Sequence, residues 1–453
     1  MSDCIERMRS FARTPLFKVI LIGLLIRILM IPLCHPYDSN FWTIVIRNAE
    51  SGYGLYQMEG YYYTPVWGYV LAFIAGVQNL LFDIGDLSVV CYDLFPYLLI
   101  EHYAYSEMAI SIVFLFNLKF ILTVSDLVTS LLLYKIVKDR TNDERKALIA
   151  FLLMFICPHV IGASSMVTMP DTISAMFTLM TIVLIKDEKH FFAGICYAVA
   201  VWVKFFPLAI IIVLLCYIYA SAGDDRKLAL KRVGMSILGF ILTTLIIFMP
   251  QIIEGTLIDS LDFITSRIAE IIGWGVLASI GVAIGAVVIV IAMLLIGRHM
   301  IHAEGNMDDR MMEYSLVFLS ACMLLYIYTN LQYLVTLMPF LIYCLLVSNF
   351  RYKYIWILLA TAGIVLTFTL DTNAAMLNSL VAFTGFVSSD WAISVFDFFN
   401  DEVFFGEFSV ADVLCLFGNT LQRVCLVLIL AIFFGCRIMK KRRRLQNPSD
   451  NDR

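Results

Sequence analysis

Long apolar runs recur along almost the whole chain and end at loops marked by charged residues, proline or glycine. The runs are continuously apolar rather than alternating, and most approach the roughly 20 residues that a membrane-spanning helix requires. The pattern predicts about twelve spans, at residues 16–33, 108–134, 147–163, 172–186, 190–203, 205–220, 233–250, 275–297, 312–328, 332–348, 354–370 and 411–436. We therefore expect an all-α fold, a polytopic transmembrane helical bundle.

The composition agrees with residence in a lipid bilayer. Of the 453 residues, 61% are hydrophobic and 15% are charged, whereas soluble domains carry about 45–50% apolar and about 25% charged residues. A water-soluble chain could not bury this much apolar surface. The lipid bilayer is therefore the first partner that the sequence predicts.

Basic residues are distributed unevenly between the loops. They cluster before the first run and, as residues 440–444 (KKRRR), directly after the last. With both termini in the cytoplasm, the basic loops fall inside, at 135–146, 186–190, 221–232, 298–311 and 349–353. The acidic or nearly neutral loops fall outside, at 34–107, 164–171, 251–274 and 371–410. This arrangement follows the positive-inside rule.

The same threading predicts the domain organisation. Residues 1–436 form a single transmembrane domain, with outer loops at 34–64 and 371–410, and residues 437–453 form a basic cytoplasmic tail. Because the tail directly follows an apolar run, we interpret it as a topology anchor and expect no nucleic-acid partner. The membrane would be the cell membrane in a prokaryote or the endoplasmic reticulum membrane in a eukaryote.

Residues 65–82 do not fit the count of spans cleanly. This stretch is apolar enough to cross the membrane, but a second crossing would then be needed before residue 108. The only candidate, residues 88–100, is short and contains Asp93 and Pro96. Either 65–82 spans with a re-entrant partner, or both stretches lie along the outer interface.

Polar residues collect at the predicted outer turns. Asp38, Asp171, Lys204 and Gln332 each fall at a different outer turn and at a similar depth. Ionisable residues near a membrane core indicate function, so this pattern predicts one active site at the outer surface. The alternative is chance, because polar residues favour helix ends in any case.

The first outer loop, residues 34–64, is rich in polar and aromatic residues. Apolar positions predict a short interfacial helix at 38–50, for which Asp38 could serve simply as the N-cap. Gly52 and Gly54 follow, together with tyrosines at 53, 56 and 61–63. These tyrosines suit either an interfacial aromatic belt or stacking against sugar rings.

These residues carry a resemblance to a known family. Tyr37-Asp38-Ser39-Asn40, Gly52-Tyr53-Gly54-Leu55-Tyr56 and Tyr61-Tyr62-Tyr63-Thr64-Pro65 occur in the first loop. Farther on come Lys119-Phe120 with Asp126-Leu127-Val128-Thr129, Pro158 with Ser164, Ser165 and Asp171, Lys204-Phe205-Phe206-Pro207, and Gln332-Tyr333-Leu334 with Pro339. In this order they resemble motifs of the glycosyltransferase-C (GT-C) superfamily, and within it the catalytic subunit of GPI mannosyltransferase I and its prokaryotic relatives.

The resemblance implies a GT-C-like fold and a sugar transfer, with mannose as the expected sugar. The donor would be a polyprenyl-phosphate or dolichyl-phosphate sugar, the acceptor a glycolipid or glycan, and the displacement inverting. Asp38 would be the catalytic base, and Lys204 or Arg47 would stabilise the departing phosphate. The expected substrate-binding residues are Asn40, Arg47, Tyr63, Asp171, Lys204, Gln332 and Tyr333. A small membrane subunit is a further expected partner.

The chain departs from the family pattern at two places. The usual Asp-x-Asp is Asp38-Ser39-Asn40 here, and an asparagine cannot act as a base. We therefore expect neither a required divalent metal nor another cofactor. Where the family often carries Gly-Asn or Gly-Gln before the later aspartate, this chain has Thr168-Met169-Pro170.

Three other functions are compatible with a membrane bundle. A flippase or transporter of lipid-linked sugars would place polar residues along a path through both leaflets, whereas here they gather outside. A polysaccharide polymerase or ligase usually has arginines in a large outer loop, and residues 371–410 contain none. An inactive subunit of a transferase complex stays open, because Asn40 replaces an acidic residue.

Overall fold

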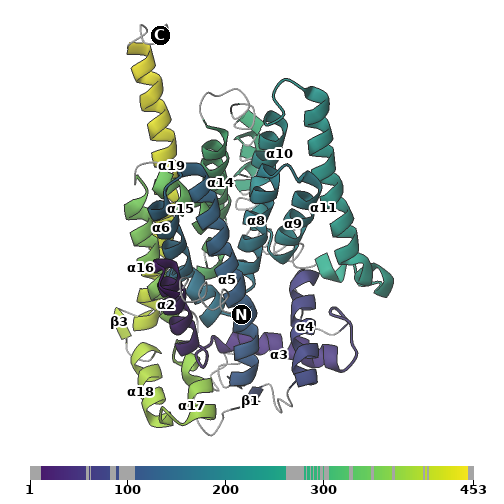
Figure 1. Ribbon diagram of the computed structural model, residues 1–453. Helices are drawn as coiled ribbons and strands as arrows, with labels where there is room; N and C mark the ends of the chain where they lie inside the picture. Colours follow the sequence, from purple (N-terminus) through teal and green to yellow (C-terminus); the bar gives the residue numbers. More distant parts are fainter. Residues whose placement is uncertain are drawn as a thin grey trace.

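The computed structural model describes residues 12–57, 61, 63–81, 88–90, 108–261, 306–325, 330–347, 351–369, 373–400, 403–405 and 408–446, with scattered positions between 280 and 299. It is a bundle of helices that run in both directions along a common axis (Figure 1). The C-terminal helix α19, Val410–Gln446, leaves the bundle at one end, and α3, Pro36–Glu50, lies across the other. We call the latter the α3 end.

Three of the described helices are long and apolar enough to cross a membrane. They are α5 (Ile112–Thr141), α11 (Arg226–Glu254) and the Val410–Gly435 part of α19. Shorter apolar helices lie between them, so the all-helical membrane bundle is confirmed at this level. The count of about twelve spans is not confirmed, and about half of the positions in the predicted span 275–297 lie outside the described residues.

The first helix, α2 (Pro15–Leu29), ends earlier than the predicted run 16–33. The last carbonyls of a helix lack partners within it. Here the ammonium of Lys119 on α5 donates hydrogen bonds to the carbonyls of Met30 (2.8 Å), Ile31 (2.9 Å) and Leu33. A cation at a helix C-terminus also complements the helix dipole. Lys119 therefore holds the turn that leads from α2 into α3.

The predicted run 147–163 is broken in the structure. Helix α6 (Glu144–Phe155) is followed by α7 (Pro158–Ile161) and by η1, a π-helical turn at Gly162–Met166, with a bend of 41°. Proline has no N–H to donate, and its ring collides with the preceding turn of a helix. Pro158 thus begins a new segment, which continues from α6 at an angle.

Helices α8 (Asp171–Lys186), α9 (His190–Val203) and α11 lie side by side. The contact between α9 and α11 is close because each helix presents a glycine to the other's backbone. A Cβ atom at Gly194 would come within 2.0 Å of the Ser236 carbonyl, and one at Gly239 within 2.2 Å of the Phe191 carbonyl. Small residues allow membrane helices to approach in this way.

The remaining elements complete the bundle. These are η2 (Phe206–Ile210), α10 (Ile211–Ala220), η3 (Asp259–Leu261), α14 (Met307–Leu325), η4 (Leu331–Thr336), α15 (Met338–Val347) and α16 (Lys353–Thr369). At the end opposite α3, Arg140 of α5 binds both carboxylate oxygens of Asp309 at 2.7 Å. Tyr343 donates to the same carboxylate at 2.7 Å, which ties α14 to α15.

The α3 end is built from short elements. They are α3, α4 (Pro65–Leu81), β1 (Ser88–Val90), β2 (Met108–Ile110), η5 (Asn373–Leu377), α17 (Asn378–Thr384), α18 (Ser389–Asn400), β3 (Val403–Phe405) and β4 (Phe408–Ser409). Strands β1 and β2 pair antiparallel, as do β3 and β4. These two small ladders are the exception to the all-α prediction among the described residues.

The structure clarifies part of the ambiguous stretch after residue 64. Residues 65–81 form α4, which contacts α3. The described part of 88–100 is a strand paired with residues 108–110, so the helix predicted from 108 begins only at Ile112. Residues 91–100 lie outside the described residues. At the other terminus, α19 continues to Gln446 and passes through the predicted boundary at 436 without a break.

Candidate active site

A buried ion pair joins α8 and α9 at the α3 end. Lys204 ends α9 in an extended conformation, and Asp171 is the first residue of the antiparallel neighbour α8. Lys204 Nζ lies 3.7 Å from Asp171 Oδ2, and the side chains are 7% and 0% exposed. At this distance the pair is longer than a tight charge-assisted hydrogen bond. The ammonium is thus held in place while its hydrogen-bonding capacity is left largely for a ligand.

Aromatic rings enclose the ammonium. Lys204 Nζ lies 4.7 Å from the centre of the Tyr63 ring and 5.6 Å from that of Tyr333. Both distances fall within the range of cation–π attraction. Tyr333 packs against Phe206, the second residue after the lysine, with ring centres 4.9 Å apart. Both predicted substrate-binding tyrosines, Tyr63 and Tyr333, therefore contact the Lys204 ammonium.

Asp38 lies in the first turn of α3, where Pro36 begins the helix and His35 is the N-cap residue. The interpretation of Asp38 as the N-cap is therefore wrong. Its side chain is 18% exposed, and its Oδ2 lies 3.4 Å from His35 Nδ1. Asp38 and Asp171 also interact as like charges. The structure thus brings the proposed base close to the buried ion pair while leaving it accessible.

Helix α3 is fastened beside this pair by hydrogen bonds to Thr168. The hydroxyls of Ser39 and Thr168 lie 3.0 Å apart, and the Trp42 indole N–H donates to the Thr168 carbonyl at 3.1 Å. Trp42 also packs edge-on against Tyr63, with ring centres 5.1 Å apart. Asp38 precedes Ser39, and Thr168 stands three residues before Asp171. These contacts therefore position both carboxylates.

Thr168 itself has a strained backbone. Its φ is +57°, in the left-handed region, where a β-branched residue is an outlier. Such a conformation costs about 1–3 kcal/mol and persists only when its surroundings enforce it. This is the segment where the chain departs from the Gly-Asn or Gly-Gln types of the family it resembles. Glycine and asparagine adopt the left-handed region more readily.

Two further predicted residues are buried near the site. Gln332 lies in η4 next to Tyr333 and is 3% exposed, and its Oε1 accepts no hydrogen bond from the described residues. Asn40 is also 3% exposed, but its Oδ1 accepts a hydrogen bond from Thr43 at 3.1 Å. Residues two apart on a helix face different directions. Asn40 therefore does not share the face of Asp38.

Arg47 is placed away from the ion pair. It is exposed in the last turn of α3, about 13 Å along the helix axis from Asp38 at the usual rise per residue. Of the two cations proposed for the departing phosphate, the structure brings only Lys204 together with Asp38 and Asp171. The role predicted for Arg47 stays a prediction.

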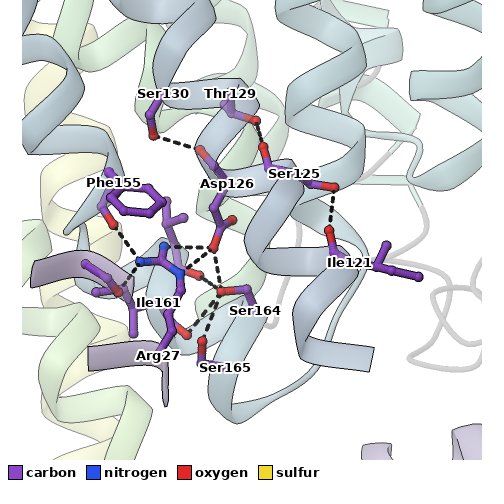
Figure 2. A network of polar contacts seen from close by, with 12 residues as sticks. Arg27, Ile121, Ser125, Asp126, Thr129, Ser130, Phe155, Ile161, Ser164 and Ser165 are labelled. Atoms are coloured by element: carbon purple, nitrogen blue, oxygen red, sulfur yellow. Dashed lines mark hydrogen bonds and ion pairs between the residues drawn. The ribbon is translucent and has the colours of Figure 1, made fainter. Parts of the chain in front are cut away.

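A second polar network joins α2, α5, α6 and η1 (Figure 2). Arg27 of α2 donates from Nε and Nη2 to Asp126 Oδ2 of α5, at 3.1 and 2.8 Å. Its Nη1 donates to the carbonyls of Gly23 and Phe155, at 3.1 and 3.0 Å. Ser164 of η1 donates to the same Asp126 oxygen at 2.7 Å. This network fixes η1, and η1 leads into the segment that holds α3.

Sequence reasoning assigned no role to His35, Ser39 or Thr168. His35 could have been found, because a residue three positions before Asp38 faces it once a helix begins at Pro36. No pattern in the sequence indicated that Thr168 meets Ser39. Among the described residues, no three His, Cys, Asp or Glu side chains are grouped as a metal site would need. That no divalent metal is required stays a prediction.

Comparison with known proteins adds one match. A model of the dolichyl-phosphate-mannose-protein mannosyltransferase family matches residues 106–253, about a third of the chain. The matched part includes Asp126, Asp171 and Lys204 but neither Asp38 nor Gln332. No curated protein matches the chain. Together with the apolar helices, the match indicates an integral membrane glycosyltransferase of the GT-C type.

Proposed function

We propose that this protein transfers mannose from a polyprenyl-phosphate or dolichyl-phosphate donor to a glycolipid or glycan acceptor on the outer or lumenal face. The observation that carries the proposal is the buried Lys204 ammonium, which contacts tyrosine rings and has the accessible carboxylate of Asp38 nearby. The family whose model matches is described by the same class of donor, which favours mannose.

The depth of the site supports a donor that stays in the bilayer. Helices α8 and α9 contain 16 and 14 residues, which corresponds to lengths of about 24 and 21 Å. The hydrocarbon core is about 30 Å thick. If the turn joining α8 and α9 lies at the inner boundary, Asp171 and Lys204 lie roughly 6–9 Å short of the outer boundary. A phosphate carried on a lipid chain can reach this depth.

The residues fit a single inverting displacement. The acceptor hydroxyl loses its proton to an Asp38 carboxylate oxygen as its own oxygen forms the bond to the anomeric carbon. The bond from that carbon to the phosphate oxygen breaks, and its electron pair leaves with the phosphate. The Lys204 ammonium stabilises the resulting negative charge, since an electrostatic group fixed before reaction is most effective. Asp171 keeps Lys204 oriented.

A transfer assay with polyprenyl-phosphate mannose and polyprenyl-phosphate glucose tests the proposal. General-base catalysis contributes roughly 10²–10⁴-fold, so the Asp38→Asn variant should lose at least about 100-fold in rate. Asp390→Asn, on the exposed first turn of α18, is the matched control and should retain activity.

Two outcomes would reject the proposal. Undiminished transfer by Asp38→Asn removes Asp38 as the base. No transfer by the wild-type protein from either donor favours the flippase or the inactive-subunit alternative.

A further inference from the structure

A second pocket lies at the far end of α3 from Asp38. It has a volume of about 280 Å³ and lies between the turn after α3, the middle of α4 and the end of α11. The lining residues are Ala49, Gly52, Tyr53, Gly54, Leu55, Tyr69, Ala72, Pro250, Gln251 and Glu254. Its volume is near the lower end of pockets that hold small molecules, which run from about 300 to 1,000 Å³.

The polar groups of this pocket are fixed by the fold. Gln251 is 1% exposed, and the Tyr69 hydroxyl lies 2.9 Å from its Oε1 and 2.8 Å from the Ile247 carbonyl oxygen. The Tyr69 contact holds one end of the amide and leaves the other end available to a ligand. A buried amide held in place in this way is characteristic of a ligand-binding pocket.

Glu254 supplies an acceptor on the other side of the pocket. A Cβ atom at Gly54 would lie 2.5 Å from Glu254 Oε2, so the carboxylate sits directly against the glycine backbone. Among the described residues, no lysine, arginine or histidine pairs with Glu254. The Gly52–Leu55 segment, which the catalytic mechanism does not use, therefore has a structural role here. It forms one wall of the pocket and allows the carboxylate to approach.

The lining chemistry limits what can bind. A buried amide, a carboxylate acceptor and the half-exposed ring of Tyr53 match the hydroxyl groups and the apolar face of a sugar. A phosphate is disfavoured, because the lining contains a carboxylate and no basic residue. An acyl chain is disfavoured because it would leave the polar groups unpaired.

We propose that this pocket binds an uncharged sugar residue of the acceptor, away from the hydroxyl that is glycosylated. The inference rests on the proposed transferase function. Ala49 and Asp38 lie on one unbroken helix, about 16 Å apart along its axis. An acceptor bound at both points would thus extend along α3, and the pocket would select acceptors that carry a sugar beyond the reacting one.

Binding of mannotriose, a neutral oligosaccharide, to the full-length protein in detergent tests the pocket without turnover. We expect Glu254→Gln and Tyr53→Ala to weaken binding in calorimetric titration by about tenfold each, as the loss of one good contact predicts. Both side chains are exposed, so the variants should fold. Asp259→Asn, in η3 outside the pocket, is the control and should bind as the wild type does.

Kinetics separate this inference from the proposed function. With the acceptor that the wild-type protein uses, both variants should raise the acceptor KM about tenfold and leave kcat and the donor KM unchanged. Wild-type transfer with an unaltered acceptor KM in both variants overturns the pocket and leaves the transferase standing. Mannotriose binding that the variants lose, in a protein without transfer activity, supports the pocket and rejects the transferase. Failure of the wild-type protein to bind mannotriose overturns the pocket.

Discussion

Removing Arg27 alone should strongly destabilise the bundle. The arginine donates two hydrogen bonds to Asp126, and the two side chains are only 3% and 0% exposed. In Arg27→Met the Asp126 carboxylate stays buried with Ser164 as its remaining donor. Removing one partner of a buried ion pair costs about 3–5 kcal/mol, because the other charge is left uncompensated. We expect a loss of this size in the free energy of unfolding.

Removing Asp126 instead of Arg27 should cost less free energy of unfolding. In Asp126→Leu, the Arg27 guanidinium keeps the carbonyls of Gly23 and Phe155 as acceptors. It also keeps a cation–π partner, because Arg27 Cζ lies 4.3 Å from the centre of the Phe155 ring. The double variant Arg27→Met/Asp126→Leu contains no buried charge at this place. Replacing both members of a buried pair by apolar residues is often neutral, so the double variant should recover most of the stability.

Denaturant titration of the purified protein in mixed micelles measures these differences as a double-mutant cycle. Lys135→Met and Asp139→Leu provide the control, since this pair is separated by 3.4 Å but each side chain is 50% exposed. Exposed pairs contribute little, and their cycle should show no measurable coupling. The reasoning would be refuted if the double variant lost as much free energy of unfolding as the two single variants together. It would also be refuted if the single variants lost no more than those of the control pair.

Three further predictions concern the active site. Lys204→Met should lower the transfer rate by roughly 10–100-fold in the mannosyl transfer assay, because a charged hydrogen bond to the phosphate contributes about 1.5–3 kcal/mol. A rate unchanged from that of the wild type would exclude Lys204 as the phosphate ligand. Tyr63→Phe should keep the donor KM, whereas Tyr63→Leu should raise it several-fold through loss of the cation–π contact with Lys204. Equal donor KM values in the two variants would contradict a role for this cation–π contact. Thr168→Asn should be more stable than Thr168→Val, since asparagine adopts a positive φ more readily and keeps a polar side chain that can hydrogen-bond Ser39. Thr168→Val should destabilise the protein by about 1 kcal/mol or more, because it keeps the β-branch at a positive φ and loses the hydroxyl contact with Ser39. A melting scan that ranks the two variants in the opposite order would be inconsistent with strain at this residue.

The sequence was a good guide where helices are regular. The run 190–203 coincides with α9, and 172–186 differs from α8 by one residue. Apolar length is a local property, so each run is visible on its own. The predictions were less accurate at Pro158, where one run becomes three elements, and at 205–220 and 332–348, which each begin with a 3-10 turn. Such breaks leave backbone N–H and C=O groups without partners inside the helix, and whether other segments supply hydrogen bonds to them depends on the tertiary structure.

Sequence alone determined that the chain is a membrane helical bundle and that Asp38, Asp171 and Lys204 stand at helix ends. These statements rest on composition, run length and residue order, which need no contact between distant segments. The tertiary structure decided which of these residues meet. It paired Lys204 with Asp171, placed Asp38 beside them and left Arg47 farther along α3. Packing between helices distant in the chain sets side-chain distances, and helical periodicity sets which face a residue occupies. Neither is fixed by a residue's position in the sequence.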